Sequence, residues 1–358
     1  MKILSIIIPT YNMESLLGAC LDSLVQSKAI DSLEVVVVND GSRDGSLAVA
    51  RRYAEQYSES VRIIDKENGN YGSTINAALP TLQGRYVKIL DADDRFDVAL
   101  VEQYVETLER SEEVDMIVSP YIEQLAHSQR RVDYNIYGRR VYEYGRCYDA
   151  EQIFTDGAIR FFAMHAVAYR TSLLRDMGYR QSEGISYTDQ EWVFYPLFEV
   201  QRILFADIPL YIYNLAREGQ TMDARVMLRS LSAQVAVTEA MSERYASAAV
   251  AGFSPARRRF LKEILRMRHR VVYRLWLLAM PDSDFSAEEF ALVDKKMATL
   301  AERCGLGRVA VPVNNILGFD MLAYWRKHSR RYPSFVRSLL RAADSAMVRL
   351  HALLFGRR

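Results

Sequence analysis

Short apolar runs alternate with amphipathic segments along the first 120 residues of the chain. Five runs have the length and composition of buried strands: Ile3–Ile8, Leu33–Val38, Val61–Asp65, Arg85–Leu90 and Val114–Val118. Four intervening segments repeat apolar residues at helical spacing: Glu14–Gln26, Ser46–Tyr57, Ser73–Leu82 and Asp97–Arg110. Strands that alternate with helices in this way predict an α/β domain built on a mostly parallel central sheet.

The pattern changes after residue 120 and again after about residue 222. Alternating Tyr and Arg residues in 121–148 predict antiparallel hairpins. Three more elements are expected before residue 222: strands at Ala166–Tyr169 and Ile208–Tyr213, and a helix at Thr188–Val200. Beyond that point only helical patterns remain. We therefore predict two domains, an α/β domain over residues 1–222 and a basic helical domain over residues 223–358.

Charge is distributed unevenly between these two regions. Residues 1–220 hold 33 acidic and 22 basic side chains, whereas residues 221–358 hold 12 acidic and 24 basic ones. Such an asymmetry indicates different roles, and the second region suits an anionic surface. No GxGxxG opens a helix and no P-loop is present, which disfavours a dinucleotide oxidoreductase and a P-loop enzyme. No zinc-finger or RRM signature is present either, so we expect no nucleic acid as a partner.

Four predicted loops follow strand ends and are rich in acids, amides and glycines. They are Pro9–Glu14, Asn39–Ser46, Glu67–Ser73 and Asp91–Asp94. Any one of them could be an ordinary turn or helix cap. However, the carboxyl ends of parallel strands meet at one edge of a sheet. Four such loops in succession therefore predict a binding site at that edge.

Asp91, Asp93 and Asp94 follow an apolar strand directly. Carboxylates at this spacing suit a divalent Mn²⁺ or Mg²⁺ that keeps open positions for phosphate oxygens. A helix cap ahead of Asp97–Arg110 would explain one acid, because acids stabilise helix N-termini. It would not explain a dense cluster immediately after a hydrophobic strand, so we expect a metal site.

The stretches SIIIPTYN, VVVVNDGSRDGS, ENGNYGSTINAAL and YVKILDADD occur in this order. Together they resemble the GT-A glycosyltransferases of inverting family two, over roughly residues 3–220. The resemblance implies an α/β nucleotide-sugar domain that transfers a sugar with inversion at the anomeric carbon. It also implies a UDP-sugar donor and a Mn²⁺ or Mg²⁺ ion held by the DxD motif.

The resemblance also assigns donor-side roles to residues of the four loops. The nucleotide and donor candidates are Pro9, Thr10, Tyr11, Glu14, Asp40, Ser42, Gly69, Gly72, Asn76, Asp91 and Asp93. Those in the first loop would border the nucleoside, and Asp40 would hydrogen-bond the base, usually uracil. Asp91 would lie near the ribose and the metal, and Asp93 would ligate the metal directly. Asp94 is a further candidate in the same cluster.

A second acidic segment, Ser186–Trp192, lies in the later part of the first domain. Inverting transfer is a direct displacement, which needs a base beside the acceptor hydroxyl. The resemblance implies that Asp189 is this base, although an acid in a first helical turn could also serve only the helix dipole. Thr188 and Glu191 have capping-box spacing, so we expect Glu191 to reach back to the Thr188 amide.

His165 and Arg217 are weaker candidates, and each has an alternative explanation. His165 precedes a predicted strand and could contact the acceptor or the diphosphate, but a lone His among apolar residues is more often packed in the core. Many members of the resembling family carry a His in the loop after the last strand. Here that loop, Tyr213–Thr221, has none. Arg217 could supply positive charge to the diphosphate instead, or be a solvated loop residue.

The basic helices of the second domain admit two interpretations. In Tyr332–Phe355 the spacing places Phe335, Val336, Leu339 and Leu340 on one face, with Arg337 and Arg341 opposite. Such a helix could pack on the catalytic domain or on a partner subunit of a homo-oligomer. Alternatively it could lie on anionic lipid, and we favour this interpretation.

Three absences bear on the cellular location. The first apolar run ends at Pro9 without a small-residue cleavage site, which favours a strand over a signal peptide. No apolar run approaches the ~18–20 residues of a spanning helix. The cysteines Cys20, Cys147 and Cys304 show no metal-binding spacing. We therefore expect a cytoplasmic protein with reduced thiols, peripheral at the inner face of the cell membrane.

The sequence thus predicts a metal-dependent inverting glycosyltransferase of the hexosyltransferase type. By resemblance, its acceptor is a glycan or a lipid-linked carrier in surface-polysaccharide synthesis. The competing hypothesis is a non-catalytic sugar-nucleotide-binding or scaffolding protein that retains the GT-A fold. Donor turnover would distinguish the two.

Overall fold

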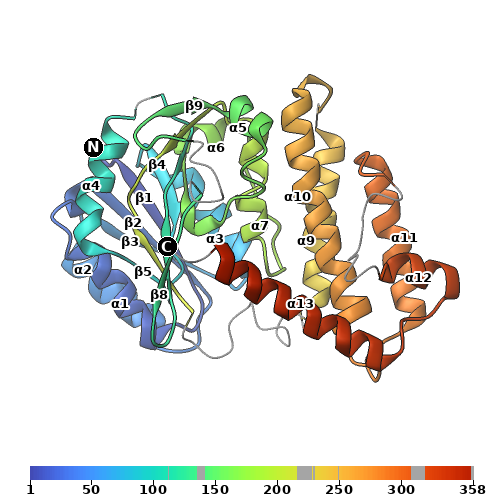
Figure 1. Ribbon diagram of the computed structural model, residues 1–358. Coiled ribbons are helices and arrows are strands. Elements are labelled where there is room, and N and C mark those ends of the chain that lie inside the picture. The colour runs from blue at the N-terminus through green and yellow to red at the C-terminus, as the bar shows by residue number, and fades with distance from the viewer. Residues whose placement is uncertain are drawn as a thin grey trace. The chain divides into compact units, whose positions relative to one another are not determined.

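The computed structural model describes residues 1–111, 113–134, 142–215, 228, 230–248, 250–307 and 319–355. The chain divides into two compact units, Met1–Arg217 and Glu218–Arg358 (Figure 1).

An eight-stranded sheet forms the core of the first unit, in the order β3-β2-β1-β4-β10-β6-β11-β9. The strands are β1 (Leu4–Thr10), β2 (Leu33–Asp40), β3 (Val61–Lys66), β4 (Tyr86–Ile89), β6 (Met116–Val118), β9 (Cys147–Asp149), β10 (Val167–Arg170) and β11 (Arg202–Phe205). Neighbours from β3 to β4 are parallel, and so are β6 and β11, whereas β10 and β9 are antiparallel to their neighbours. The prediction of an α/β fold with a mostly parallel sheet is confirmed.

Helices connect the parallel strands as predicted. They are α1 (Glu14–Val25), α2 (Ser46–Gln56), α3 (Asn70–Ala78) and α4 (Val98–Glu109), followed later by α5 (Ala150–Asp156), α6 (Thr171–Asp176) and α7 (Asp189–Trp192). Short 3-10 turns complete the unit: η1 (Ile30–Ser32), η2 (Leu79–Thr81), η3 (Met164–Ala166) and η4 (Tyr195–Phe198). All eight residues of β2 are buried, which explains its continuous apolar run.

The predicted helix over Thr188–Val200 is wrong. The α-helix α7 ends at Trp192, and η4 follows after a break. Pro196 lies inside the predicted helix, and a proline lacks the N–H that an α-helix interior requires. The stretch instead forms two short helical segments, α7 and η4, and its aromatic side chains are buried.

A second sheet of four strands has the order β5-β12-β7-β8. Its strands are β5 (Arg95–Phe96), β7 (Tyr121–Gln124), β8 (Gln129–Val132) and β12 (Tyr211–Asn214). β7 and β8 form an antiparallel hairpin, as predicted for this stretch. β12 pairs with β5 through Tyr211 and Phe96, which brings the end of the first unit next to the turn that precedes β5.

The second unit is helical in its described residues, as predicted. Its helices are α9 (Leu231–Ser247), η5 (Val250–Gly252), α10 (Pro255–Arg274), the π-helical η6 (Leu275–Ala279), α11 (Ala287–Arg303), α12 (Met321–His328) and α13 (Ser334–Phe355). Aromatic side chains form part of its core, where the Phe290 and Trp325 ring centroids lie 4.9 Å apart. No helix among the described residues has the length and apolar character that crossing a bilayer requires.

The predicted division of faces on α13 is wrong. Leu340 and Arg337 are buried, whereas Phe335 and Leu339 are 74% and 59% exposed. The guanidinium of Arg337 donates to the carbonyl oxygens of Met280 and Tyr332 and pairs with Asp282. Because these groups satisfy the buried charge, an arginine occupies the inner face and two large apolar side chains remain outside.

Candidate active site

The turn Asp91–Asp94 follows β4, and β12 fixes it from the second sheet. The Tyr211 hydroxyl donates to Asp94 Oδ2 at 2.6 Å and accepts the Asp91 N–H at 3.2 Å. The Asn214 N–H donates to Asp94 Oδ1 at 2.8 Å. The turn itself is closed by the Asp94 N–H, which donates to the Asp91 carbonyl at 2.9 Å. These contacts hold Asp91 and Asp94 at the carboxyl end of the sheet.

The acids of this turn crowd one another. Burial raises the pKa of Asp91 well above its usual range, and the neighbouring charges of Asp94 and Asp93 raise it further. Burial likewise raises the pKa of Asp94 to about 7, even though Asn214 and Tyr211 donate hydrogen bonds to it. An excess of buried negative charge of this kind is what a bound divalent cation compensates.

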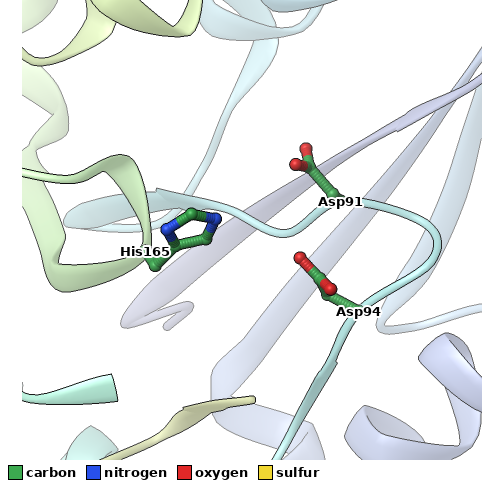
Figure 2. Close-up of side chains that lie close together, drawn as sticks. All are labelled: Asp91, Asp94 and His165. Atoms are coloured by element: carbon green, nitrogen blue, oxygen red, sulfur yellow. The ribbon is translucent and has the colours of Figure 1, made fainter. Parts of the chain in front are cut away.

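Asp91, Asp94 and His165 come together at this point (Figure 2). One ligand atom of each residue lies within 4.8 Å of the other two. Two carboxylates and an imidazole form a donor set that fits Mn²⁺. The two carboxylates alone also suit Mg²⁺, which prefers oxygen ligands. Asp93 lies in the same turn but outside this trio, and its role as a direct ligand stays a prediction.

His165, from η3, is packed among tyrosines and also faces the acids (Figure 2). Its ring stacks on Tyr213 with centroids 4.1 Å apart and meets Tyr211 edge-on at 4.8 Å. Nδ1 is buried without a hydrogen-bond partner among the described residues. Burial and, to a smaller extent, the charge of Lys88 together lower the pKa of His165 to about 3. The ring is therefore neutral, the form that binds metals.

Lys88 is a residue of this site that sequence reasoning missed. It is fully buried on β4, and its Nζ donates to the carbonyl oxygens of His165 at 2.7 Å and Val167 at 3.0 Å. Burial lowers the pKa of Lys88 to about 7. The signal was a lysine within an otherwise apolar strand, a place where charged residues are rare.

The carboxylate of Asp40 organises the adjoining loops at the end of β2. Its Oδ1 accepts hydrogen bonds from Lys66 Nζ at 2.8 Å, the Gly69 N–H at 3.0 Å and the Ser73 hydroxyl at 3.3 Å. The Asn68 amide donates to the Asp40 carbonyl at 2.8 Å. Asp40 thus joins the ends of β2 and β3 to the start of α3. Lys66 was not predicted.

The first two predicted loops also contact each other. Glu14 accepts the Gly45 N–H at 2.9 Å, and the Ser42 hydroxyl accepts the Asn12 N–H at 3.1 Å. The Thr10 hydroxyl is buried and donates to the Ile8 carbonyl at 3.1 Å. Tyr11 is 44% exposed, while Pro9 lies within β1 opposite Val38. The candidates from both loops therefore lie at the same edge of the sheet.

Glu191 does not form the predicted capping box. Its carboxylate accepts hydrogen bonds from the Ser182 N–H at 2.6 Å, the Ser182 hydroxyl at 2.7 Å and the Tyr195 hydroxyl at 3.0 Å. Thr188 forms no capping hydrogen bond, and its Oγ1 is buried without a partner among the described residues. The prediction is wrong because Ser182 and Tyr195, nine and four residues away, bind the carboxylate in place of the Thr188 N–H.

The loop before α7 is also tied to α3. Asn76 accepts the Gln181 N–H at 2.9 Å and donates to the Gln181 carbonyl at 2.9 Å. Gly184 donates its N–H to the Gly69 carbonyl at 2.9 Å. A Cβ at Gly72 would lie 2.0 Å from the Ser182 carbonyl oxygen. Three predicted donor-side residues therefore contact the loop that leads to Asp189.

Asp189 opens α7 and is partly exposed. The preceding Tyr187 has φ +67°, a left-handed conformation that is costly for a non-glycine residue and recurs at functional sites. Tyr71 links this acid electrostatically to the Asp91–Asp94 turn. Its hydroxyl donates to Asp91 Oδ1 at 2.8 Å, and burial together with the charges of Asp91 and Asp189 raises the pKa of Tyr71. Arg217 lies outside the described residues.

Comparisons with known proteins agree with this architecture. Residues 5–178 match the profile of the family described as Glycosyl transferase family 2. The putative glycosyltransferase EpsH of Bacillus subtilis is 26% identical over 59% of this chain and 60% of its own length. The glycosyltransferase GlyA of Streptococcus pneumoniae is 29% identical over 70% of this chain and 35% of its own length. The chain thus spans about a third to three fifths of these relatives.

A solved structure extends the likeness of the fold to nearly the whole chain. The S. aureus TarS fragment 1–349, in complex with UDP-GlcNAc, superposes with a TM-score of 0.65 at 18% identity. The match covers 98% of this chain and 92% of that one. The fold is therefore that of the GT-A glycosyltransferases, and the domain match with its relatives supports a family-two glycosyltransferase.

Proposed function

We propose that this protein is a metal-dependent inverting glycosyltransferase that uses a UDP-sugar and extends a glycan or lipid-linked acceptor of a surface polysaccharide. The supporting observation is that the Tyr71 hydroxyl donates to Asp91 of the Asp91–Asp94 turn, while the loop that leads to Asp189 is hydrogen-bonded to the donor-side residues Asn76 and Gly69. The glycosyltransferase relatives and the family-two domain support sugar transfer as the reaction.

The nucleotide would bind at the loops that Asp40 joins. Its Oδ1 receives three hydrogen bonds, while Oδ2 receives none of these and can accept the N3–H of a uracil ring. The TarS fragment forms a complex with UDP-GlcNAc, which supports the same choice of nucleotide.

Asp91 and Asp93 would hold the cation, next to Asp94 and His165. A bound Mn²⁺ or Mg²⁺ would supply charge neutralisation for the leaving diphosphate. The residues present fit such an ion, because three carboxylates share this turn and burial raises the pKa of two of them. Tyr71, Tyr211 and the Asn214 N–H hold those carboxylates in place.

Asp189 would accept the proton of the acceptor hydroxyl. The acceptor oxygen then forms a bond to the anomeric carbon while the bond from that carbon to the UDP oxygen breaks on the opposite face. The proton ends on Asp189 and the negative charge on UDP, and the configuration inverts. A base held by the loop that contacts the donor-side residues Asn76 and Gly69 would be placed correctly for such a displacement.

Two measurements test the proposal. UDP with Mn²⁺ should raise the melting temperature more than GDP with Mn²⁺, since a ligand that binds only the folded state stabilises it. A panel of UDP-, GDP- and dTDP-sugars with Mn²⁺ should then release nucleoside diphosphate from a UDP-sugar. Equal or greater stabilisation by GDP would overturn the uridine assignment. Binding without any turnover of donor would instead favour a non-catalytic sugar-nucleotide-binding protein.

We further propose that the protein binds peripherally to the inner face of the cell membrane through α13. Phe335 and Leu339 are exposed on this helix, and Arg341, two residues after Leu339, is exposed as well. Exposed apolar residues beside basic ones are typical of helices that lie on anionic lipid. A lipid-linked acceptor would be reached most readily from that position.

A further inference from the structure

Lys88 extends the link between β4 and β10 beyond the end of their backbone ladder. The two strands pair at only two positions, Tyr169 with Val87 and Arg170 with Tyr86. Beyond these two pairs the Lys88 side chain makes the connection, because its Nζ donates hydrogen bonds to the carbonyl oxygens of Val167 and His165. Lys88 is therefore the contact from β4 that fixes the segment carrying His165, while the Ser119 N–H holds the Ala166 carbonyl from the β6 side.

The same strand presents the acids that face His165. Asp91 and Asp94 follow Lys88 by three and six residues, and the imidazole ring lies beside both carboxylates (Figure 2). Lys88 therefore links the two halves of the candidate metal centre directly, from the strand that leads to the acids to the backbone of His165. A shift of the η3 backbone would move the ring away from the acids without altering the acids themselves.

Packing alone does not account for a lysine at this position. Lys88 is fully buried, and it forms no ion pair with a described carboxylate. Removing an ammonium group from water is costly unless its hydrogen bonds are replaced. Methionine or leucine would fill a similar volume without that cost. The two carbonyl contacts are what lysine contributes and an apolar residue cannot.

We propose that His165 is the nitrogen ligand of the divalent cation at the Asp91–Asp94 turn, and that Lys88 is the positioning residue that holds it there. This inference rests on the proposed metal dependence. The histidine ligand would then come from η3, because the loop Tyr213–Thr221 contains no histidine.

The test measures Mn²⁺ binding to the full-length protein with UDP present. Mn²⁺ in the wild type should show hyperfine coupling to a directly bound nitrogen in pulsed electron paramagnetic resonance. His165→Gln should lose the coupling and weaken Mn²⁺ affinity at least tenfold. Lys88→Met should weaken Mn²⁺ affinity about 10- to 100-fold, as loss of a supporting contact behind a ligand commonly does. UDP affinity without metal should stay unchanged in both.

Matched variants separate this role from stability. Val87→Ala removes buried volume from the next position of β4, and His127→Gln alters an exposed histidine. Neither should change Mn²⁺ affinity. Lys88→Gln, which keeps N–H donors, should recover part of the loss. A wild type without nitrogen coupling overturns the ligand assignment whether or not any variant folds.

The remaining outcomes also decide between the proposals. If Lys88→Met behaves like Val87→Ala, with lower stability and normal Mn²⁺ affinity, Lys88 is a packing residue and its positioning role fails. If His165→Gln retains wild-type Mn²⁺ affinity, His165 is a core residue. If the wild type binds UDP equally well with and without Mn²⁺, the proposed metal dependence itself fails.

Discussion

Glu191 receives two hydrogen bonds from Ser182, one from the backbone N–H at 2.6 Å and one from the hydroxyl at 2.7 Å. On the other side of the same loop, Asn76 holds both backbone groups of Gln181. The loop is therefore clamped between α3 and α7. Any change that loosens this clamp should disturb Asp189, which lies two residues before Glu191.

Glu191→Gln tests the clamp. Glu191 is fully buried, and its carboxylate accepts three hydrogen bonds. The glutamine side chain would replace one carboxylate oxygen with an NH₂ group, which is itself a donor. The Ser182 or Tyr195 donor that faces it would then lose its acceptor. We expect a loss of about 1–3 kcal/mol in the free energy of unfolding, measured with urea, and a lower transfer rate. Glu199→Gln, at an exposed position, serves as the control. Wild-type stability of Glu191→Gln would contradict this role.

Gly72→Ala tests the same clamp from the donor side. The added Cβ would lie 2.0 Å from the Ser182 carbonyl oxygen and 3.0 Å from the Gln181 Cβ. Because the nearer atom belongs to the backbone, the whole loop must move. We expect transfer to fall by an order of magnitude or more, as for a displaced catalytic group, in steady-state assays. Gly252→Ala, where no atom lies within 4 Å, should have little effect. Normal activity in Gly72→Ala would show that the loop tolerates displacement.

Asp189→Asn separates the base from the metal site. The amide cannot accept the acceptor proton, so transfer should fall by about 10²–10⁴-fold. Affinity for Mn²⁺ and UDP, measured by calorimetry, should stay close to that of the wild type. Asp93→Asn should instead weaken Mn²⁺-dependent UDP binding and abolish transfer together. Retained transfer in Asp189→Asn would move the base to another residue.

The sheet and the four loops could be predicted because each depends on neighbouring residues. Apolar runs fix the strands, and the loops follow from where those runs end. The Asp91–Asp94 cluster was visible for the same reason. Its supports were not, because Tyr211 and Asn214 lie 117 and 120 residues from Asp94 along the chain. No local pattern specifies which tyrosine will meet which acid.

The errors have a common physical cause. Thr188 and Glu191 have the spacing of a capping box, yet the Glu191 carboxylate accepts hydrogen bonds from Ser182 and Tyr195 instead. The rule that charged side chains lie at the surface predicts an exposed Arg337. Its guanidinium is buried instead and donates to the Met280 carbonyl oxygen just after η6. In both cases hydrogen bonds outside the expected spacing satisfy the buried group: Ser182 lies nine residues from Glu191, and Met280 lies 57 residues from Arg337.

His269 gives the second unit a pH-dependent stability. It is fully buried, with Nε2 3.1 Å from the Ser242 hydroxyl. Burial lowers the pKa of His269 from 6.5 to about 4, and Arg268 adds to the effect. Between these pH values the unfolded chain takes up a proton that the folded chain excludes. Stability should therefore fall with decreasing pH across this window, by on the order of 1 kcal/mol per unit.

His269→Gln isolates this contribution. Glutamine can still hydrogen-bond Ser242 but does not titrate. The melting temperature of the variant should therefore fall less than that of the wild type between pH 6.5 and pH 4. His127→Gln, at an exposed position, should follow the wild-type curve. Parallel curves for wild type and His269→Gln would mean that the buried ring does not govern the acid response.

Binding of α13 to lipid is best tested with point variants. Deleting residues 330–358 would also remove Arg331 and Arg337, which hydrogen-bond the carbonyl oxygens near the end of η6, so lost binding could reflect lost structure. Phe335 and Leu339 are exposed, and their replacement leaves those contacts in place. Burying each in the interface would contribute about 2 kcal/mol. Phe335→Ser with Leu339→Ser should therefore weaken binding to anionic vesicles by tenfold or more.

The controls for this experiment distinguish lipid binding from general stickiness. Leu292→Ser removes an equally exposed leucine from α11 and should leave vesicle binding unchanged. Raising the salt concentration should release the wild type, because screening weakens the attraction of Arg341 and its basic neighbours to anionic headgroups. Neutral phosphatidylcholine vesicles should bind poorly under all conditions. A wild type that ignores anionic vesicles at low salt, or a double variant that binds as well as the wild type, would show that the outer face of α13 does not contact lipid.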